Sequence, residues 1–230
     1  MNHHLAIPQA LTEQEAPLAL LDATIRHYGD SVALVSSLGP QTLVILDMIH
    51  RLGHTAKVIM VDTGVLFPET YALKARVEDR YGIRIHAVSA PAAMIAQQQA
   101  EGPTPWTRAP NQCCALRKVA PLREALRGYQ AWITGIRADQ TTHRQRTQRV
   151  GWDASYGLMK INPLLDWRRG QVFAWLAAHR VPYNPLLDQG YTSIGCAPCT
   201  RLPDDPTDER SGRWAGTEKT ECGLHLPSEP

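Results

Sequence analysis

Short apolar runs alternate with helix-type stretches along most of the chain, and this alternation restricts the fold more than any other feature. SVALVSS at 31–37 and AKVIMVD at 56–62 both end in small or polar residues, and each precedes a stretch with helical spacing. The second of these stretches has Pro68 suited to a first helical turn and Gly82 suited to a stop. Further strand-type runs lie at 83–88 and 129–135, and further helix-type stretches at 91–100, 114–127 and 168–180. This order predicts an α/β fold with a mostly parallel sheet flanked by helices.

The composition excludes several classes of protein. The 230 residues are 43% hydrophobic and 20% charged, which is ordinary for one globular domain with appendages. Basic residues outnumber acidic ones by only 24 to 22, so no global field favours nucleic acid or an anionic membrane. No apolar run approaches the roughly 18 residues of a membrane span, and the N-terminal segment lacks the pattern of a signal peptide. We therefore expect a cytoplasmic protein, whose five cysteines are metal ligands or reactive thiols rather than disulfides.

The character of the sequence changes near residue 200. From Arg201 onward the chain is rich in proline, glycine and charged residues, and it has almost no aliphatic periodicity. We expect residues 1–200 to form the domain and residues 201–230 to form a mobile C-terminal tail that carries the fifth cysteine.

Four of the five cysteines form two close pairs that are distant in sequence, Cys113 with Cys114 and Cys196 with Cys199. Two such pairs can supply a four-thiolate metal site. Adjacent side chains on a helix diverge by about 100 degrees, so the first pair suits two irons of a cubic cluster better than one tetrahedral zinc. Structural zinc, unrelated buried cysteines and a redox dithiol at the second pair remain open.

Cys222 has no partner in this pattern. It lies in the tail with Lys219 and His225 nearby, where substrates and proteins can reach a thiol. An incidental surface cysteine explains the residue equally well.

Two loops at strand ends are candidates for anion binding. Ser36, Ser37 and Gly39 lie between the first strand and its helix, where backbone N–H groups and the helix dipole can hold a phosphate. The loop lacks the ending of a Walker A motif, and helix capping is the competing interpretation. Arg137 and Arg144 follow the run at 129–135, at the sheet edge where open α/β folds bind ligands, although a solvated basic loop would look the same. The same two interpretations apply to Lys118, Arg210 and Arg213.

Together these segments resemble the assimilatory adenylyl-sulfate reductases, within the wider phosphoadenylyl-sulfate reductase family of the adenine-nucleotide alpha-hydrolase-like (PP-loop) fold. The similarity extends from about Ser31 to His225. Its pieces occur in family order: SSLG at 36–39, VDTGVLFPETY at 61–71, CCALRKVAPL at 113–122, TGIRADQ at 134–140, YTSIGCAPCTR at 191–201, ERSGRW at 209–214 and KTECGLH at 219–225.

The resemblance implies a reaction and a set of roles. It implies reduction of adenylyl sulfate to sulfite and AMP in sulfate assimilation, with thioredoxin or glutaredoxin as electron donor. Cys222 matches the nucleophile that forms an S-sulfocysteine. The four paired cysteines match the ligands of a 4Fe-4S cluster, which the branch that acts on the 3'-phosphorylated nucleotide generally lacks. The remaining matches are nucleotide-contacting segments at Ser36, Ser37, Gly39, Asp62, Thr63 and Gly64, and charge-neutralising residues at Lys118, Arg137, Arg144, Arg210 and Arg213.

Three other functions stay open at this point. A reductase of 3'-phosphoadenylyl sulfate shares the family pattern, an iron-sulfur tRNA thiolase shares the loop and can carry cysteine-bound clusters, and a zinc-binding module would use the same four cysteines. A homo-oligomeric assembly is compatible with each of them.

Overall fold

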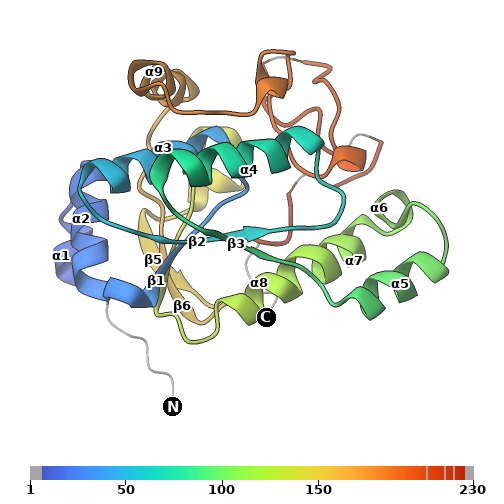
Figure 1. Ribbon diagram of the computed structural model, residues 1–230, viewed down its shortest axis with the longest axis horizontal. Coiled ribbons are helices and arrows are strands. Elements are labelled where there is room, and N and C mark those ends of the chain that lie inside the picture. Colours follow the sequence, from blue (N-terminus) through green and yellow to red (C-terminus); the bar gives the residue numbers. More distant parts are fainter. Residues whose placement is uncertain (1–6, 206, 215, 220, 226–230) are drawn as a thin grey trace. The chain divides into compact units, whose positions relative to one another are not determined.

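The computed structural model describes residues 7–205, 207–214, 216–219 and 221–225 (Figure 1). Its strands form a six-stranded sheet in the order β3-β2-β1-β4-β6-β5. The strands are β1 (Val32–Val35), β2 (Lys57–Val61), β3 (Ile85–Val88), β4 (Ala131–Ile133), β5 (Val150–Asp153) and β6 (Leu158–Ile161). The α-helices are α1 (Gln9–Thr12), α2 (Pro17–Tyr28), α3 (Pro40–Arg51), α4 (Pro68–Tyr81), α5 (Ala92–Ala100), α6 (Pro105–Arg108), α7 (Pro110–Cys114), α8 (Ala120–Ala125) and α9 (Arg169–His179).

The strand registers confirm the predicted fold class. β1 runs parallel to β4 with Val32 opposite Ala131, and β4 runs parallel to β6 with Ala131 opposite Met159. β5 is antiparallel to β6 and closes that side of the sheet. The sheet is therefore mostly parallel, with one antiparallel strand.

The central helix α3 is buried almost all round. Every residue from Thr42 to Ile49 in it is buried, and α3 contacts β1, α2 and α9. Its one buried acid, Asp47, accepts hydrogen bonds from Arg51 Nε at 2.7 Å and from Trp175 Nε1 at 2.9 Å, which offsets the cost of burying a carboxylate. This hydrogen-bonded acid fixes α9 against α3.

The chain divides into two compact units, each made of separate stretches of sequence. The first unit comprises residues 1–35, 40–58 and 128–181, and the second comprises 36–39, 59–127 and 182–230. The described part of the C-terminal segment belongs to the second unit, where Thr200 pairs with Arg213 in an isolated antiparallel bridge. The domain boundary at residue 200 and the mobility of the tail stay predictions.

The sequence missed two helices and two strands of the first unit. Helices α1 and α2 went unnoticed, and so did the hairpin of β5 and β6. Its turn ends at Gly157, whose φ of +70° is a conformation that favours glycine.

The predicted helix over 114–127 is interrupted. α7 ends at Cys114, a π-helical turn covers Ala115–Val119, and α8 begins at Ala120. Pro121 has no N–H to donate to the carbonyl four residues earlier, so a regular α-helix cannot continue through this point.

The loop after β1 is also shorter than the sequence suggested. Helix α3 begins at Pro40, so only Ser36–Gly39 connects the two elements.

Among the described residues, no helix is both long and apolar enough to cross a membrane.

Candidate functional site

All five cysteines lie in the second unit as free thiols. Cys113 and Cys114 end α7 and are buried, at 7% and 5% exposure. Cys196 is equally buried and precedes the 3₁₀ turn Ala197–Cys199, whose last residue is half-buried. Two sequence-distant pairs, here called the cysteine group, are thus held by short helical segments.

The thiols of the cysteine group influence one another's ionisation. Burial raises the pKa of Cys113, and the charges of Cys114 and Cys196 add to this increase. Burial, together with the charge of Cys196, raises the pKa of Cys199 to about 11. Cys114 is shifted upward by burial as well. A negative charge on one of these thiols disfavours ionisation of its neighbours. A nearby positive charge is therefore needed for several of them to be thiolates at once.

The capacity of the cysteine group to hold a metal ion or a cluster depends on its donors and on the charges around it. Among the described residues, no three His, Cys, Asp or Glu side chains are arranged to hold one ion, and an iron-sulfur cluster on the cysteine group stays a prediction. Ligands of a cubic cluster bind separate irons and need not converge on one point. Arg117 supplies a buried donor near Cys113. Its Nη2 has no hydrogen-bond partner within the described chain, and its charge lowers the pKa of Cys113. An anionic group bound by the cysteines would face this donor.

Arg117 is a site residue that the sequence interpretation missed. It is 3% exposed, and it donates to Gln98 Oε1 at 2.7 Å and to the Thr63 carbonyl at 2.8 Å. It therefore ties the π-helical turn to the segment that follows β2. Its place beside Lys118 in the CCALRKVAPL motif was the available signal.

Lys118 lies in the π-helical turn and is half-buried. Burial lowers its pKa, but the charges of Cys196, Cys222 and Cys114 raise it, and the net shift is upward. The positive charge of Lys118 therefore interacts with the cysteine group and with Cys222, and its role in catalysis stays a prediction.

The segment after β2 approaches the cysteine group. Thr63 Oγ1 lies 3.3 Å from Cys196 Sγ, and an isolated antiparallel bridge joins Leu66 to Cys196. Asp62 Oδ1 accepts from the Gly64 N–H at 2.9 Å and from the Tyr71 hydroxyl at 2.8 Å. Gly64 has a φ of +73°, which allows the tight turn. The structure thus brings the predicted Asp62–Gly64 segment to the predicted metal ligands.

The Ser36–Gly39 loop belongs to the same unit. Ser36 is buried, its N–H donates to the Ile59 carbonyl at 2.8 Å, and its Oγ accepts from the Leu38 N–H at 3.0 Å. Ser37 is exposed and Gly39 is half-buried. The loop is a folded turn with its serines at different depths, and anion binding there stays a prediction.

Cys222 is held by its neighbour in sequence and lies near Lys118. Its backbone N–H donates to Glu221 Oε1 at 2.9 Å, and the same oxygen accepts from Arg210 Nη2 at 2.9 Å. The Arg210 and Arg213 guanidinium carbons lie 5.4 and 4.6 Å from the centre of the buried Trp214 ring. The C-terminal segment therefore carries the predicted nucleophile and two predicted arginines in one set of contacts.

Arg137 and Arg144 belong to the first unit. Arg137 is fully buried and its Nε is 2.9 Å from Asp139 Oδ1, while Arg144 is 6% exposed and donates to Gln140. Both partners, Asp139 and Gln140, lie in the 3₁₀ turn Ala138–Gln140. Their part in a common substrate site stays a prediction.

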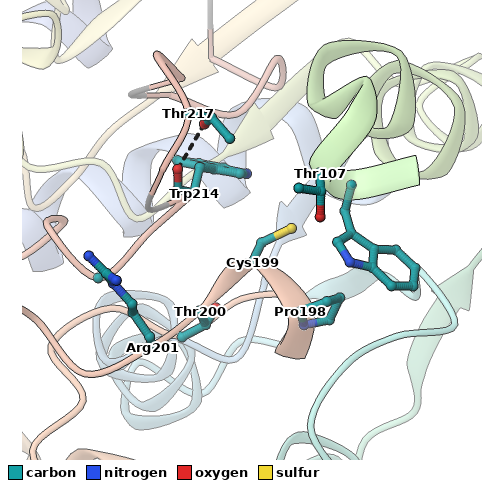
Figure 2. Close-up of a pocket in the computed structure, with 9 residues that line it drawn as sticks. Thr107, Pro198, Cys199, Thr200, Arg201, Trp214 and Thr217 are labelled. Atoms are coloured by element: carbon teal, nitrogen blue, oxygen red, sulfur yellow. Dashed lines mark hydrogen bonds between the residues drawn. The ribbon is translucent and has the colours of Figure 1, made fainter. Parts of the chain in front are cut away.

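A small pocket borders the cysteine group within the second unit. It has a volume of about 130 Å³ and is lined by Trp106, Thr107, Pro198, Cys199, Thr200, Arg201, Gly212, Trp214 and Thr217. Figure 2 shows the Cys199 thiol on its wall, with Trp214 on one side and Thr107 on the other. A small reagent in this pocket would meet Cys199 before any other member of the cysteine group.

A comparison with protein families identifies the family of the chain. Residues 31–202 match the model of the phosphoadenosine phosphosulfate reductase domain. The chain belongs to the phosphoadenosine phosphosulfate reductase family. The predicted family resemblance is therefore confirmed.

Relatives of this reductase family align over nearly the whole chain. The adenosine 5'-phosphosulfate reductase of Salinibacter ruber is 42% identical over 98% of this chain and 90% of its own. Adenosine 5'-phosphosulfate reductase 2 of Bacillus subtilis is 43% identical over 90% and 89%. The phosphoadenosine 5'-phosphosulfate reductase of Gloeobacter violaceus is 44% identical over 93% and 90%.

Solved structures agree with the family and the fold. The phosphoadenylyl-sulfate reductase of Candida auris, solved as a phosphate complex, has a TM-score of 0.73 and 31% identity, and covers 83% of this chain and 92% of its own. Yeast FAD synthetase has a TM-score of 0.58 at 14% identity, with coverage of 85% and 66%. At that identity the second likeness shows only a shared fold.

Proposed function

We propose that the protein reduces adenylyl sulfate to sulfite and AMP through an S-sulfocysteine at Cys222, with thioredoxin as reductant, in the cytoplasmic assimilation of sulfate. One observation carries the proposal: the segment that holds Cys222 also holds Arg210 and Arg213, and Glu221 Oε1 joins the Cys222 backbone to Arg210. The names of the relatives from Salinibacter ruber and Bacillus subtilis support the same substrate.

The first step is a transfer of the sulfonate group to a thiolate. The Cys222 sulfur attacks the sulfur of the phosphosulfate anhydride, a new S–S bond forms, and the S–O bond to the phosphate breaks. The electron pair of the broken bond leaves with AMP. The product on the protein is an S-sulfocysteine.

The second step releases sulfite. A thioredoxin thiolate attacks the Cys222 sulfur, sulfite leaves with the electron pair of the S–S bond, and a mixed disulfide forms. The second thioredoxin thiol then resolves this disulfide and restores the Cys222 thiol. Two electrons pass from the dithiol to the sulfur of the sulfonate, and thioredoxin ends as a disulfide. Glutaredoxin could supply the same electrons.

Like charges oppose the first step, because a thiolate must approach a sulfonate and a phosphate. In this proposal Lys118, Arg210 and Arg213 of the second unit neutralise this field. Arg137 and Arg144 of the first unit contribute further positive charge in this proposal. The nucleotide is contacted by Ser36, Ser37, Gly39 and the Asp62–Gly64 segment.

The cysteine group would hold a 4Fe-4S cluster. When bound, the cluster would keep the four cysteines as thiolates and would set the local electric field. No electron of the reaction passes through it, since the thiols already account for both. Lys118, which responds to the charges of Cys114 and Cys196, would be positioned by that field.

A second candidate substrate is 3'-phosphoadenylyl sulfate. The relative from Gloeobacter violaceus carries that specificity in its name and is 44% identical. The presence of the full cysteine group supports adenylyl sulfate instead.

The test is intact-mass analysis of cluster-loaded protein mixed with adenylyl sulfate, without reductant. We expect a sulfonate adduct on the wild type and none on Cys222→Ser, while the visible absorption of the cluster persists in both. A parallel reaction with the 3'-phosphorylated nucleotide separates the two substrates by the rate of adduct formation. A wild type that forms no adduct with either nucleotide would refute the proposed reaction.

A further inference from the structure

Glu221 is a buried acid that the proposed reaction does not use. It is 5% exposed and lies directly before the nucleophile. A buried carboxylate is costly unless it is paired and hydrogen-bonded, so its contacts indicate why it is tolerated.

One carboxylate oxygen of Glu221 accepts two hydrogen bonds. Oε1 accepts from the backbone N–H of Cys222 and from Arg210 Nη2, each at 2.9 Å. The side chains of Arg210 and Glu221 are 13% and 4% exposed, so water screens this ion pair little. Arg210 in turn lies over the ring of Trp214, which is 3% exposed. Trp214, Arg210, Glu221 and the Cys222 backbone therefore form a chain of buried contacts.

We propose that Glu221 is a positioning residue: its Oε1 fixes the backbone of Cys222 to Arg210, and thereby sets where the thiol meets the substrate. This inference rests on the proposed function, since it needs Cys222 to be the nucleophile. Glu221 does not touch the substrate. It acts through the direction of the Cys222 N–H, because the N–H and the Cα–Cβ bond of one residue move together.

Two substitutions of Glu221 can separate the effect of its hydrogen bonds on the position of Cys222 from the effect of its negative charge. Glutamine keeps an acceptor oxygen at the same reach but loses the negative charge. Aspartate keeps the charge but is one methylene shorter, so its oxygens cannot reach both donors without moving the backbone. A positioning role predicts that Glu221→Gln works better than Glu221→Asp, and a purely electrostatic role predicts the reverse.

The experiment measures single-turnover formation of the Cys222 adduct at saturating adenylyl sulfate, with nucleotide affinity measured separately in a Cys222→Ser background. We expect Glu221→Asp to slow adduct formation about 100-fold, because a misplacement of about 1 Å can cost that much. Glu221→Gln should stay within about tenfold of the wild type, since a neutral acceptor weakens but does not remove both bonds. Nucleotide affinity should change by less than about threefold in either variant, so the effect falls on the rate and not on binding.

Glu218→Gln and Glu218→Asp are the matched controls, because Glu218 is an exposed acid of the same segment. Both should react at the wild-type rate. Adduct formation in Glu221→Asp that equals or exceeds that of Glu221→Gln would overturn the inference, as would wild-type rates in both. A wild type without any adduct would overturn the proposed function instead, so the two failures are distinguishable.

Discussion

Gly195 offers a way to move Arg213 without changing any charged residue. Arg213 is 9% exposed, its Nε donates to the Cys199 carbonyl at 3.3 Å, and its guanidinium crosses the space where Gly195 has no side chain. A Cβ on Gly195 would lie 2.5 Å from Arg213 Cζ. Gly195→Ala should therefore displace the guanidinium while leaving the arginine itself in the protein.

The size of the effect follows from this contact. Carbon atoms pack best at about 3.5–4.0 Å, so the guanidinium must withdraw by about 1 Å or more. Such a displacement of a charge-neutralising group should slow formation of the Cys222 adduct about 100-fold. Overpacking of about 2 kcal/mol should lower the melting temperature by about 4–8 °C.

The assay is single-turnover adduct formation, followed by intact mass, with thermal unfolding of the same preparations. Gly170→Ala in α9 is the matched control, because a Cβ there meets nothing within 4 Å and the helix accepts alanine. It should react at the wild-type rate with an unchanged or higher melting temperature. A Gly195→Ala variant with wild-type rate and stability would refute the reasoning.

Three further predictions follow from the second unit. Arg117→Ala leaves two buried acceptors without their donor, so it should lower the free energy of unfolding by about 3 kcal/mol, measured by urea denaturation. A loss below about 1 kcal/mol would contradict this prediction. In metal-free protein, iodoacetamide should modify the half-buried Cys222 before the three buried cysteines, and peptide mapping that gives the opposite order would exclude the described burial. Burial, followed by the hydrogen bond to Asp62, raises the pKa of Tyr71 to about 12. Because the folded state retains this proton, its stabilising contribution is complete below about pH 10 and is lost as the pH rises through 12; ultraviolet titration should show a transition there that Tyr71→Phe removes.

The sequence predicted the elements whose signals are local. The apolar runs of β1, β2, β3 and β4 were recognised because each is bounded by polar or small residues. Helix α4 begins at Pro68 and is capped at its C-terminus by Gly82 with a φ of +62°, as the spacing predicted. The antiparallel pair β5 and β6 escaped because each strand has only four residues and is stabilised by pairing across the sheet, which the local sequence does not report.

The site was predicted as a set of residues but not as a set of contacts. The cysteines, Lys118, Arg210 and Arg213 were marked by motifs, and the structure places them all in one unit. Arg117 and Glu221 were not singled out, because their importance lies in burial and in partners distant along the chain. Periodicity and composition do not report such pairings.

The π-helical turn at Ala115–Val119 decides how an insertion or a deletion in this part of the chain would affect its shape. Each residue of a helix adds about 100 degrees of rotation and about 1.5 Å of rise. A π-helical turn accommodates one more residue than an α-helical turn, because its hydrogen bonds close over five residues instead of four. Deleting one residue here would therefore convert the turn to regular α-helix and leave α8 near its present rotation relative to Cys113 and Cys114. An added residue would instead turn α8 by about 100 degrees, so a graft of this segment onto another member of the family tolerates a one-residue deletion here better than an insertion.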